Sequence, residues 1–140
     1  MKEKLQILLA ERKVNVIAES SQIECLSVLG TGAFGKVELI RFRKKFYAQK
    51  RALHRTAPQL ISIIDEGIKL TDICDQHRNI QRLNFINLDC YGIIIDYCSN
   101  GSLHSFISNE ASKYNLTDVL SWSYQLADAL SFLHNHDMSP

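Results

Sequence analysis

The chain has 140 residues, a length that suits one domain with a packed core. Hydrophobic residues make up 46% of the sequence and charged residues 22%, a balance that excludes wholesale disorder. The formal net charge of +1 gives the chain no overall attraction to nucleic acid or to a membrane surface.

Cysteine usage and hydropathy indicate an intracellular protein. The four cysteines, Cys25, Cys74, Cys90 and Cys98, have neither metal-ligand nor C-x-x-C spacing. The apolar run that ends at Ala10 is too short, and too charged on both sides, for a secretory signal. No window approaches the roughly 18 apolar residues of a membrane span. We therefore expect a soluble, cytoplasmic protein with reduced thiols, no membrane partner and no metal ligands within these residues.

The first half of the chain predicts a short extension followed by strands. Residues 1–22 are expected to form an N-terminal extension with a short helix through Lys4–Lys13 and no recognisable chemistry. Ile23–Leu29 predicts a strand, and Val37–Ile40 and Phe46–Leu53 predict two more.

A glycine-rich motif, G-x-G-x-x-G-x-V, lies between the first two of these strands and is formed by Gly30, Gly32, Gly35 and Val37. Because glycine has no Cβ, such a loop lets the backbone approach a polyphosphate and direct its N–H groups at the phosphate oxygens. A Rossmann dinucleotide motif has the same glycines but requires a helix directly after the third, where this chain predicts a strand. Plain hairpin turns also carry such glycines, so the motif alone leaves both interpretations open.

Lys50 lies thirteen residues after Val37, in a stretch from Arg41 to Arg55 that holds seven Lys or Arg residues and no Asp or Glu. On a strand, Ala48 and Lys50 point to the same face, so a small residue accompanies a cation near the glycines. This placement favours a phosphate contact over the alternative in which Lys50 is one more cation of a basic hairpin turning near residues 44–45. For the stretch as a whole we expect a solvated hairpin edge rather than a nucleic-acid patch.

The next predicted element is a helix over residues 56–74, where the sequence T-A-P marks the start. Gly67 interrupts this helix at a cost of about 1 kcal/mol relative to alanine, which counts against its regularity. Glu66 within it is the candidate partner of Lys50. The alternatives are that Glu66 is an exposed helix acid, or that Asp65 takes its place.

After this helix the chain predicts a hairpin and a linker. Residues 77–83 read H-R-N-I-Q-R-L and lead into strands at Leu83–Leu88 and Tyr91–Tyr97. The second strand holds three consecutive isoleucines and ends in D-Y-C-S-N-G-S-L at residues 96–103. The Asn-Gly pair in that run predicts a tight turn.

Two helices are predicted for the rest of the chain. The first covers residues 102–109. The second, Leu116–His134, has apolar residues at i, i+3, i+4 and i+7 spacing and is capped by Thr117 or Asn115, so we expect it to belong to a core.

Taken in order, these motifs resemble the eukaryotic protein kinase superfamily from about Leu26 to Pro140. The glycine loop, the strand lysine, the helix glutamate, the H-x-N-I segment and the D-Y-C…G-S-L passage are collinear with its motifs. The D-Y-C…G-S-L passage is most similar to that of Mos-like, Raf-like and MAP kinase kinase kinase enzymes. One departure is that H-x-N-I lies about two residues further from Glu66 than usual, which implies a small insertion around residues 73–76 or a misassigned glutamate.

The resemblance implies an α+β, protein-kinase-like fold. Its first lobe, residues 23–95, would be a five-stranded antiparallel sheet with one helix, followed by a hinge at 96–101. Residues 102–140 would then be the first helices of a helical second lobe.

The resemblance also implies ATP as the ligand and a protein Ser or Thr hydroxyl as the phosphoryl acceptor. Lys50 would contact the α and β phosphates and be held by Glu66, the two residues with catalytic roles. Ile95 would be the gatekeeper, and the backbone of Asp96 and Cys98 would pair with adenine. The implied nucleotide site comprises Leu29, Gly30, Thr31, Gly32, Ala33, Phe34, Gly35, Val37, Ala48, Lys50, Ile95, Asp96, Cys98 and Ser102.

The 140 residues contain neither an H-R-D catalytic loop nor the D-F-G motif that holds Mg²⁺. We therefore expect the metal ligands to lie beyond Pro140 and the chain alone to be inactive as a transferase. Two other functions stay open: a non-catalytic nucleotide-binding product of the pseudokinase or scaffold type, and polyanion binding by the basic hairpin. The exposed apolar stripe expected on the last helix argues against a free-standing product.

Overall fold

A computed structural model of the chain describes residues 2–11, 14–17, 20–32, 35–54, 56–73 and 76–136. Its contacts divide the chain into two compact units. The first unit spans residues 1–75 and 81–97, and the second spans residues 76–80 and 98–140.

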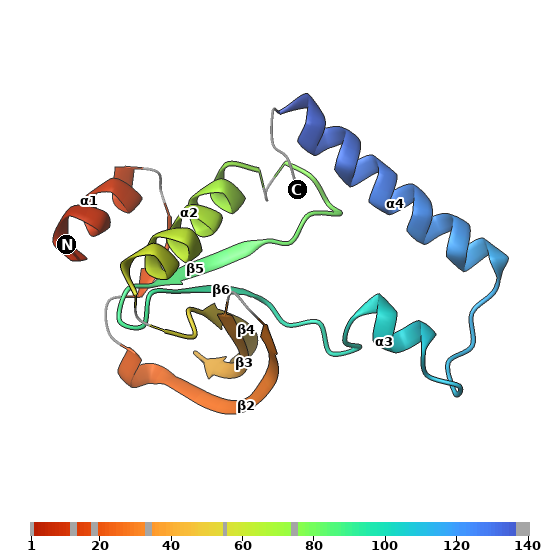
Figure 1. The fold of residues 1–140 in the computed structure, drawn as a ribbon, viewed down its shortest axis with the longest axis horizontal. Helices are drawn as coiled ribbons and strands as arrows, with labels where there is room; N and C mark the ends of the chain where they lie inside the picture. The colour runs from red at the N-terminus through yellow and green to blue at the C-terminus, as the bar shows by residue number, and fades with distance from the viewer. Residues whose placement is uncertain are drawn as a thin grey trace. The chain divides into compact units, whose positions relative to one another are not determined.

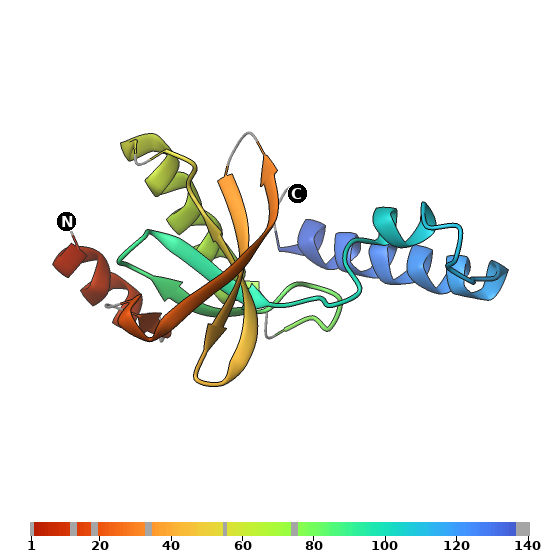
Figure 2. The same cartoon turned by 90° about the horizontal axis from the view of Figure 1, so that it is seen from below.

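Within the described residues, the first unit forms a six-stranded sheet with the strand order β1-β5-β6-β4-β3-β2 (Figures 1 and 2). The strands are β1 (Val16–Ile17), β2 (Ile23–Gly32), β3 (Gly35–Phe42), β4 (Lys45–Arg51), β5 (Leu83–Asn87) and β6 (Gly92–Asp96). Neighbouring strands are antiparallel except β1 and β5, which are parallel. Figure 2 shows β2 as the long, curved strand at one edge.

The predicted α+β fold is confirmed, but the prediction of five antiparallel strands is wrong by one strand. Strands β2 to β6 are the predicted antiparallel set, and β1 is the unpredicted addition. With two residues, β1 is too short to show an alternating pattern. It is a strand because a distant segment pairs with it: the Ile86 N–H donates to the Asn15 carbonyl and the Leu88 N–H to the Ile17 carbonyl, each at 2.9 Å.

The segment before residue 23 packs into the first unit. It forms α1 (Lys2–Glu11), β1 and a short 3₁₀ helix, η1 (Ser20–Gln22). Leu9 of α1 is fully buried and belongs to the larger core cluster. The predicted helix through Lys4–Lys13 therefore begins two residues earlier, and its last two predicted residues lie outside the described ones. This segment contributes to the core rather than only extending from it.

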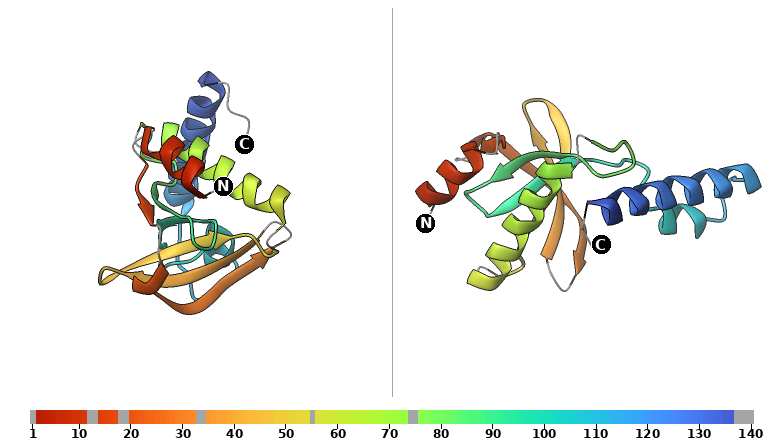
Figure 3. Two further views of the ribbon diagram at one scale, coloured as in Figure 1. Left: turned by 90° about the vertical axis from the view of Figure 1, so that its left-hand side faces the viewer. Right: turned by 90° about the horizontal axis from the view of Figure 1, so that it is seen from above.

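α2 (Ala57–Ile73) covers one face of the sheet at β5 and β6 (Figures 1 and 3). The Leu60 N–H donates to the Thr56 carbonyl at 3.0 Å, as expected if Thr56 is the N-cap. The larger core cluster on this face comprises Leu9, Ala52, Leu60, Ile63, Ile64, Ile86, Leu88 and Ile93. A second cluster comprises Ile17, Ile40, Phe42 and Ile94. Because Ile93 and Ile94 are consecutive on β6, the two clusters lie on opposite faces of the sheet.

Gly67 does not interrupt α2, which runs unbroken past it. The residue is buried where the helix approaches β5 and β6 most closely. A Cβ at this position would lie 2.7 Å from Ile93 Cγ2 and 3.1 Å from Ile86 Cδ1. The glycine that appears unfavourable in the sequence is therefore what allows α2 to pack tightly on the sheet.

We expect Gly67→Ala to lower the free energy of unfolding by about 1 kcal/mol. The gain in helix propensity of about 1 kcal/mol is outweighed by an overpacking cost of about 1–3 kcal/mol. Urea unfolding measures this, with Ser62→Ala on the exposed face of the same helix as the control, expected to change stability by less than about 0.5 kcal/mol. A stabilised Gly67→Ala variant would contradict the close approach.

The hairpin between β3 and β4 turns at Arg43 and Lys44, one residue before the predicted position. Both residues have positive φ, 49° and 65° respectively. Two such residues in succession are typical of a type I′ turn, which matches the twist of the strands on either side. The turn therefore places two cations at the end of this hairpin.

The second unit contains α3 (Leu103–Ile107), α4 (Leu116–Asn135) and the segment at 76–80. Asn115 caps α4 in a capping box: the Asp118 N–H donates to the Asn115 side chain, and the Asn115 N–H donates to the Asp118 carboxylate. The segment at 76–80 is attached to α4 through the Asp128 carboxylate. This group contacts His77 Nε2 and accepts from Asn79 Nδ2, each at 3.1 Å.

The structure does not show the core position expected for α4, since neither α3 nor α4 has a buried residue among the described residues. Leu116, Leu120 and Leu126 are each at least 60% exposed. Trp122 packs on Phe106 of α3, and Phe132 packs on His77. These neighbours cover only parts of the helix, so the apolar stripe remains exposed, as the sequence also led us to expect.

Candidate functional site

Lys50 on β4 and Glu66 on α2 form a close ion pair. Lys50 Nζ lies 2.7 Å from Glu66 Oε1 and 2.6 Å from Oε2. The two side chains are 29% and 40% exposed, so the pair remains partly accessible to solvent. The contact implied by the resemblance is therefore present, and it is made by Glu66, whereas Asp65 is exposed. The predicted insertion around residues 73–76 falls partly outside the described residues.

The three motif glycines differ in their surroundings. Gly30 and Gly32 lie on the edge strand β2, and a Cβ at either position would meet nothing within 4 Å. Gly35 begins β3, and a Cβ there would lie 2.6 Å from the backbone oxygen of Arg51. Two glycines thus have open space around them, and the third is required by the fold. Ala33 and Phe34, which lie between them, are outside the described residues.

Strand register places further predicted residues on the face that carries Lys50. Lys50 pairs with Val37 on β3, and Ala48, which is buried, pairs with Ile95 on β6. Cross-strand partners share a face, and so do residues two apart, so these four residues line one surface beside α2. Leu29 on β2 is 44% exposed. The backbone thus assembles a small buried residue, apolar neighbours and a cation on one face.

The remaining predicted residues lie at the end of β6 and beyond it. Asp96 is exposed, and its carboxylate accepts a hydrogen bond from Asn84 Nδ2 at 2.8 Å. This side chain therefore links β6 to β5. Cys98 and Ser102 belong to the second unit. Cys98 is an exposed free thiol, and Ser102 caps α3 by accepting from the Ser105 N–H at 3.1 Å. Ser102 is therefore the N-cap of α3.

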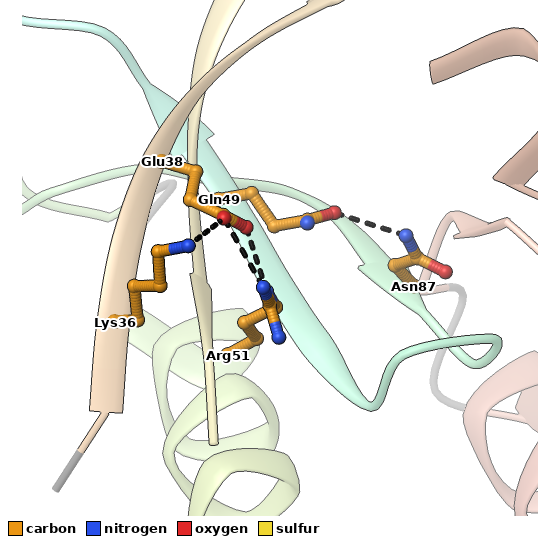
Figure 4. Close-up of polar contacts among 5 residues, drawn as sticks. All are labelled: Lys36, Glu38, Gln49, Arg51 and Asn87. Carbon is orange, nitrogen blue, oxygen red and sulfur yellow. Dashed lines mark hydrogen bonds and ion pairs between the residues drawn. The ribbon is translucent and has the colours of Figure 1, made fainter. Parts of the chain in front are cut away.

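A partly buried ionic network on the opposite face of the sheet was not predicted (Figure 4). Glu38 on β3 is only 4% exposed. It accepts from Arg51 Nε at 2.6 Å and from Arg51 Nη2 at 3.1 Å, and it pairs with Lys36 Nζ at 2.6 Å. Next to it, buried Asn87 donates to buried Gln49 at 2.9 Å.

The electrostatics of this network follow from its hydrogen bonds. The Arg51 bonds, with help from Lys36, lower the pKa of Glu38 from its ordinary value of 4.5 to about 2, although burial opposes the shift. The same bond to Glu38 raises the pKa of Arg51 above its ordinary value. The sequence signal that could have revealed this network is the alternation of side chains along β3, which places Lys36 and Glu38 on the face opposite Val37.

Three of the six described cations of the basic stretch pair with glutamates from neighbouring strands and from α2. Arg41 pairs with Glu24, Lys50 with Glu66 and Arg51 with Glu38. Arg43, Lys44 and Lys45, which lie outside these pairs, are exposed at the turn of the described hairpin, and the solvated edge expected from the sequence stays a prediction. Arg55 lies outside the described residues.

In the part of the chain that the structure describes, no cluster of three or more His, Cys, Asp or Glu side chains is arranged to hold a metal ion. We therefore assign no metal ligand. No helix among the described residues has the length and apolar character needed to cross a membrane.

Comparison with known proteins gives a family match. The family model for protein tyrosine and serine/threonine kinases matches residues 23–139. The chain is 28% identical over 115 residues to the mitogen-activated protein kinase kinase kinase mom-4 of Caenorhabditis briggsae, covering 78% of this chain and 21% of that protein. It is 27% identical over 120 residues to the serine/threonine-protein kinase mos of Xenopus laevis, covering 81% and 33%.

A third relative is the human mitogen-activated protein kinase kinase kinase 13, 30% identical over 117 residues, with coverage of 82% and 11%. Two of the three classes named from the sequence, Mos-like and MAP kinase kinase kinase, are thus among the relatives. The chain spans a third or less of the length of each of these three proteins.

Proposed function

The chain belongs to the protein tyrosine and serine/threonine kinase family, and from this premise we propose that its first compact unit binds ATP. In the intact enzyme, the γ-phosphoryl group would pass to a serine or threonine hydroxyl of a protein. The observation that supports this most directly is the Lys50–Glu66 pair beside the glycine-bearing strands.

The chemistry of the pair suits a polyphosphate. Phosphoryl transfer depends on positioning and charge stabilisation, and a lysine at the α and β phosphates supplies both. Glu66 restrains the ammonium of Lys50, so less side-chain entropy is lost when the phosphates bind. The pair is partly exposed, so the ammonium can exchange part of its contact with Glu66 for a phosphate oxygen.

The backbone around the glycines suits the same ligand. The open space at Gly30 and Gly32 would let the phosphates approach the backbone N–H groups of this stretch, including that of Thr31. Leu29, Val37, Ala48 and Ile95 would enclose the adenine ring, with the buried Ala48 leaving room for it.

The other predicted roles remain part of the proposal. The backbone of Asp96 and Cys98 would pair with the adenine edge, and Ser102 would meet the ribose, in addition to capping α3. Ala33 and Phe34 would cover the phosphates. The division into lobes at 23–95 and 102–140 with a hinge at 96–101 is part of the same proposal, and a cytoplasmic location stays a prediction. Mg²⁺, when bound, would neutralise phosphate charge, and we assign it no ligand in this chain.

ATP titration of the 140-residue chain tests the proposal. We expect Lys50→Met to weaken ATP binding by at least about tenfold, the effect of losing one charge-assisted contact. Lys45→Met is the matched control, because it removes the same charge from an exposed position of the same strand and should leave binding unchanged. Equal losses in both variants would indicate non-specific charge attraction and count against the site. Folding is checked for each variant by circular dichroism.

A further inference from the structure

The Glu38 network lies directly behind the Lys50 position. Val37 and Lys50 are cross-strand partners on one face, and the residues next to them in sequence, Lys36, Glu38 and Arg51, point to the other. Figure 4 shows Lys36 and Arg51, from neighbouring strands, converging on the Glu38 carboxylate. The network therefore joins β3 to β4 at the level of the predicted phosphate contact.

Arg51 also contacts the glycine motif through its backbone. Its carbonyl oxygen occupies the space that a Cβ of Gly35 would need. The Arg51 side chain is thus held by Glu38, its carbonyl abuts Gly35, and its preceding neighbour is Lys50. A shift of Arg51 would move both parts of the predicted phosphate site.

The charges make one strand register more favourable than its neighbours. Lys36 and Arg51 are directly opposite each other across β3 and β4, an arrangement of like charges that is destabilising without a counterion. Glu38 supplies that counterion and is only 4% exposed. A slip of β3 by one residue would turn Glu38 to the other face together with Lys36 and would remove it from Arg51 on β4, leaving Arg51 without its counterion.

We propose that Glu38 and Arg51 are positioning residues for the nucleotide, which hold β3 and β4 in the register that places Lys50 and Gly35 at the phosphates. The proposal rests on ATP binding by the first unit. It assigns to the network a role in affinity for the phosphates of the ligand, rather than for its nucleoside.

The test compares ATP with adenosine, which lacks the phosphates, in the 140-residue chain by NMR titration. The main variant is Glu38→Leu combined with Arg51→Met. It conserves net charge and replaces the partly buried Glu38–Arg51 pair by apolar side chains of similar size, a change that is often neutral for stability. A second variant, Arg51→Lys, retains the charge but loses the forked donor geometry.

If the network positions the site, the ratio of ATP to adenosine affinity falls by about tenfold in the double variant and by less in Arg51→Lys, while adenosine affinity is retained. Glu24→Gln is the matched control, because it breaks the exposed Glu24–Arg41 pair between β2 and β3 and should leave the ratio unchanged.

Two results would overturn the inference: an unchanged ratio in variants that fold as the wild type does, or equal losses for ATP and adenosine, which indicate general loosening of the sheet. If the double variant fails to fold, the ratio in Arg51→Lys decides. Failure of the proposed function has a different signature. In that case the wild-type chain itself shows no preference for ATP over adenosine, and Lys50→Met changes nothing.

Discussion

Acidification from pH 4.5 to pH 2 is expected to remove on the order of 3 kcal/mol of stability through Glu38 alone. The carboxylate has a pKa of about 2 in the folded chain and an ordinary value of 4.5. The folded state thus binds this proton more weakly than the unfolded state does. The stabilisation is complete above pH 4.5 and is lost as the pH falls through about 2, with each pKa unit equivalent to about 1.4 kcal/mol.

The difference between wild type and Glu38→Gln isolates this contribution. At neutral pH the variant should be less stable by about 3 kcal/mol, because Arg51 and Lys36 lose their buried counterion. As the pH falls from 4.5 to 2, the two urea-unfolding curves should converge. Glu24→Gln serves as the control and should follow the wild type throughout, since that pair is exposed. Curves that remain parallel over this pH range would show that Glu38 is not the buried, paired carboxylate described.

Elements with a strong local pattern were predictable from the sequence. The helix α4 has a regular 3.6-residue apolar period and a capping residue, Asn115, and it begins at the predicted Leu116. Strand β1 has no local signal, because two residues become a strand only by pairing with β5. The β3–β4 turn lacks the glycine or asparagine that usually marks positive φ, so its position was one residue off.

The predicted and unpredicted parts of the site differ for a related reason. The Lys50–Glu66 contact follows from motif order, because the glycines, the lysine and the helix glutamate occur at recognisable separations. Glu38 and Arg51 belong to no motif, and Arg51 reads in the sequence as one more cation of a basic stretch. The sequence also cannot show that Gly67 and Gly35 are needed at close approaches, because each approach is made to a residue distant in the chain.

We expect the three motif glycines to separate into two classes on substitution by alanine. Gly35→Ala should lower the free energy of unfolding by about 2 kcal/mol, because the new Cβ would lie 2.6 Å from the Arg51 backbone oxygen. A backbone atom within a paired strand cannot move aside as the end of a flexible side chain can. Gly30→Ala and Gly32→Ala should change stability by less than about 0.5 kcal/mol, since their surroundings are open and neither has positive φ.

ATP affinity should fall in all three variants, whereas stability should fall only in Gly35→Ala, and this difference is what makes the series informative. If the phosphates approach the backbone at Gly30 and Gly32, a methyl group at either position weakens ATP binding several-fold without affecting folding, whereas adenosine binding is retained. Gly35→Ala should weaken ATP binding together with stability, because it displaces Arg51 and with it Lys50. Thermal unfolding and ATP titration of the three variants measure both properties. Unchanged ATP affinity in stable Gly30→Ala and Gly32→Ala variants would mean that the glycine-rich segment is only a hairpin. Any ligand bound at Lys50 would then be bound without a contribution from the glycine-rich segment.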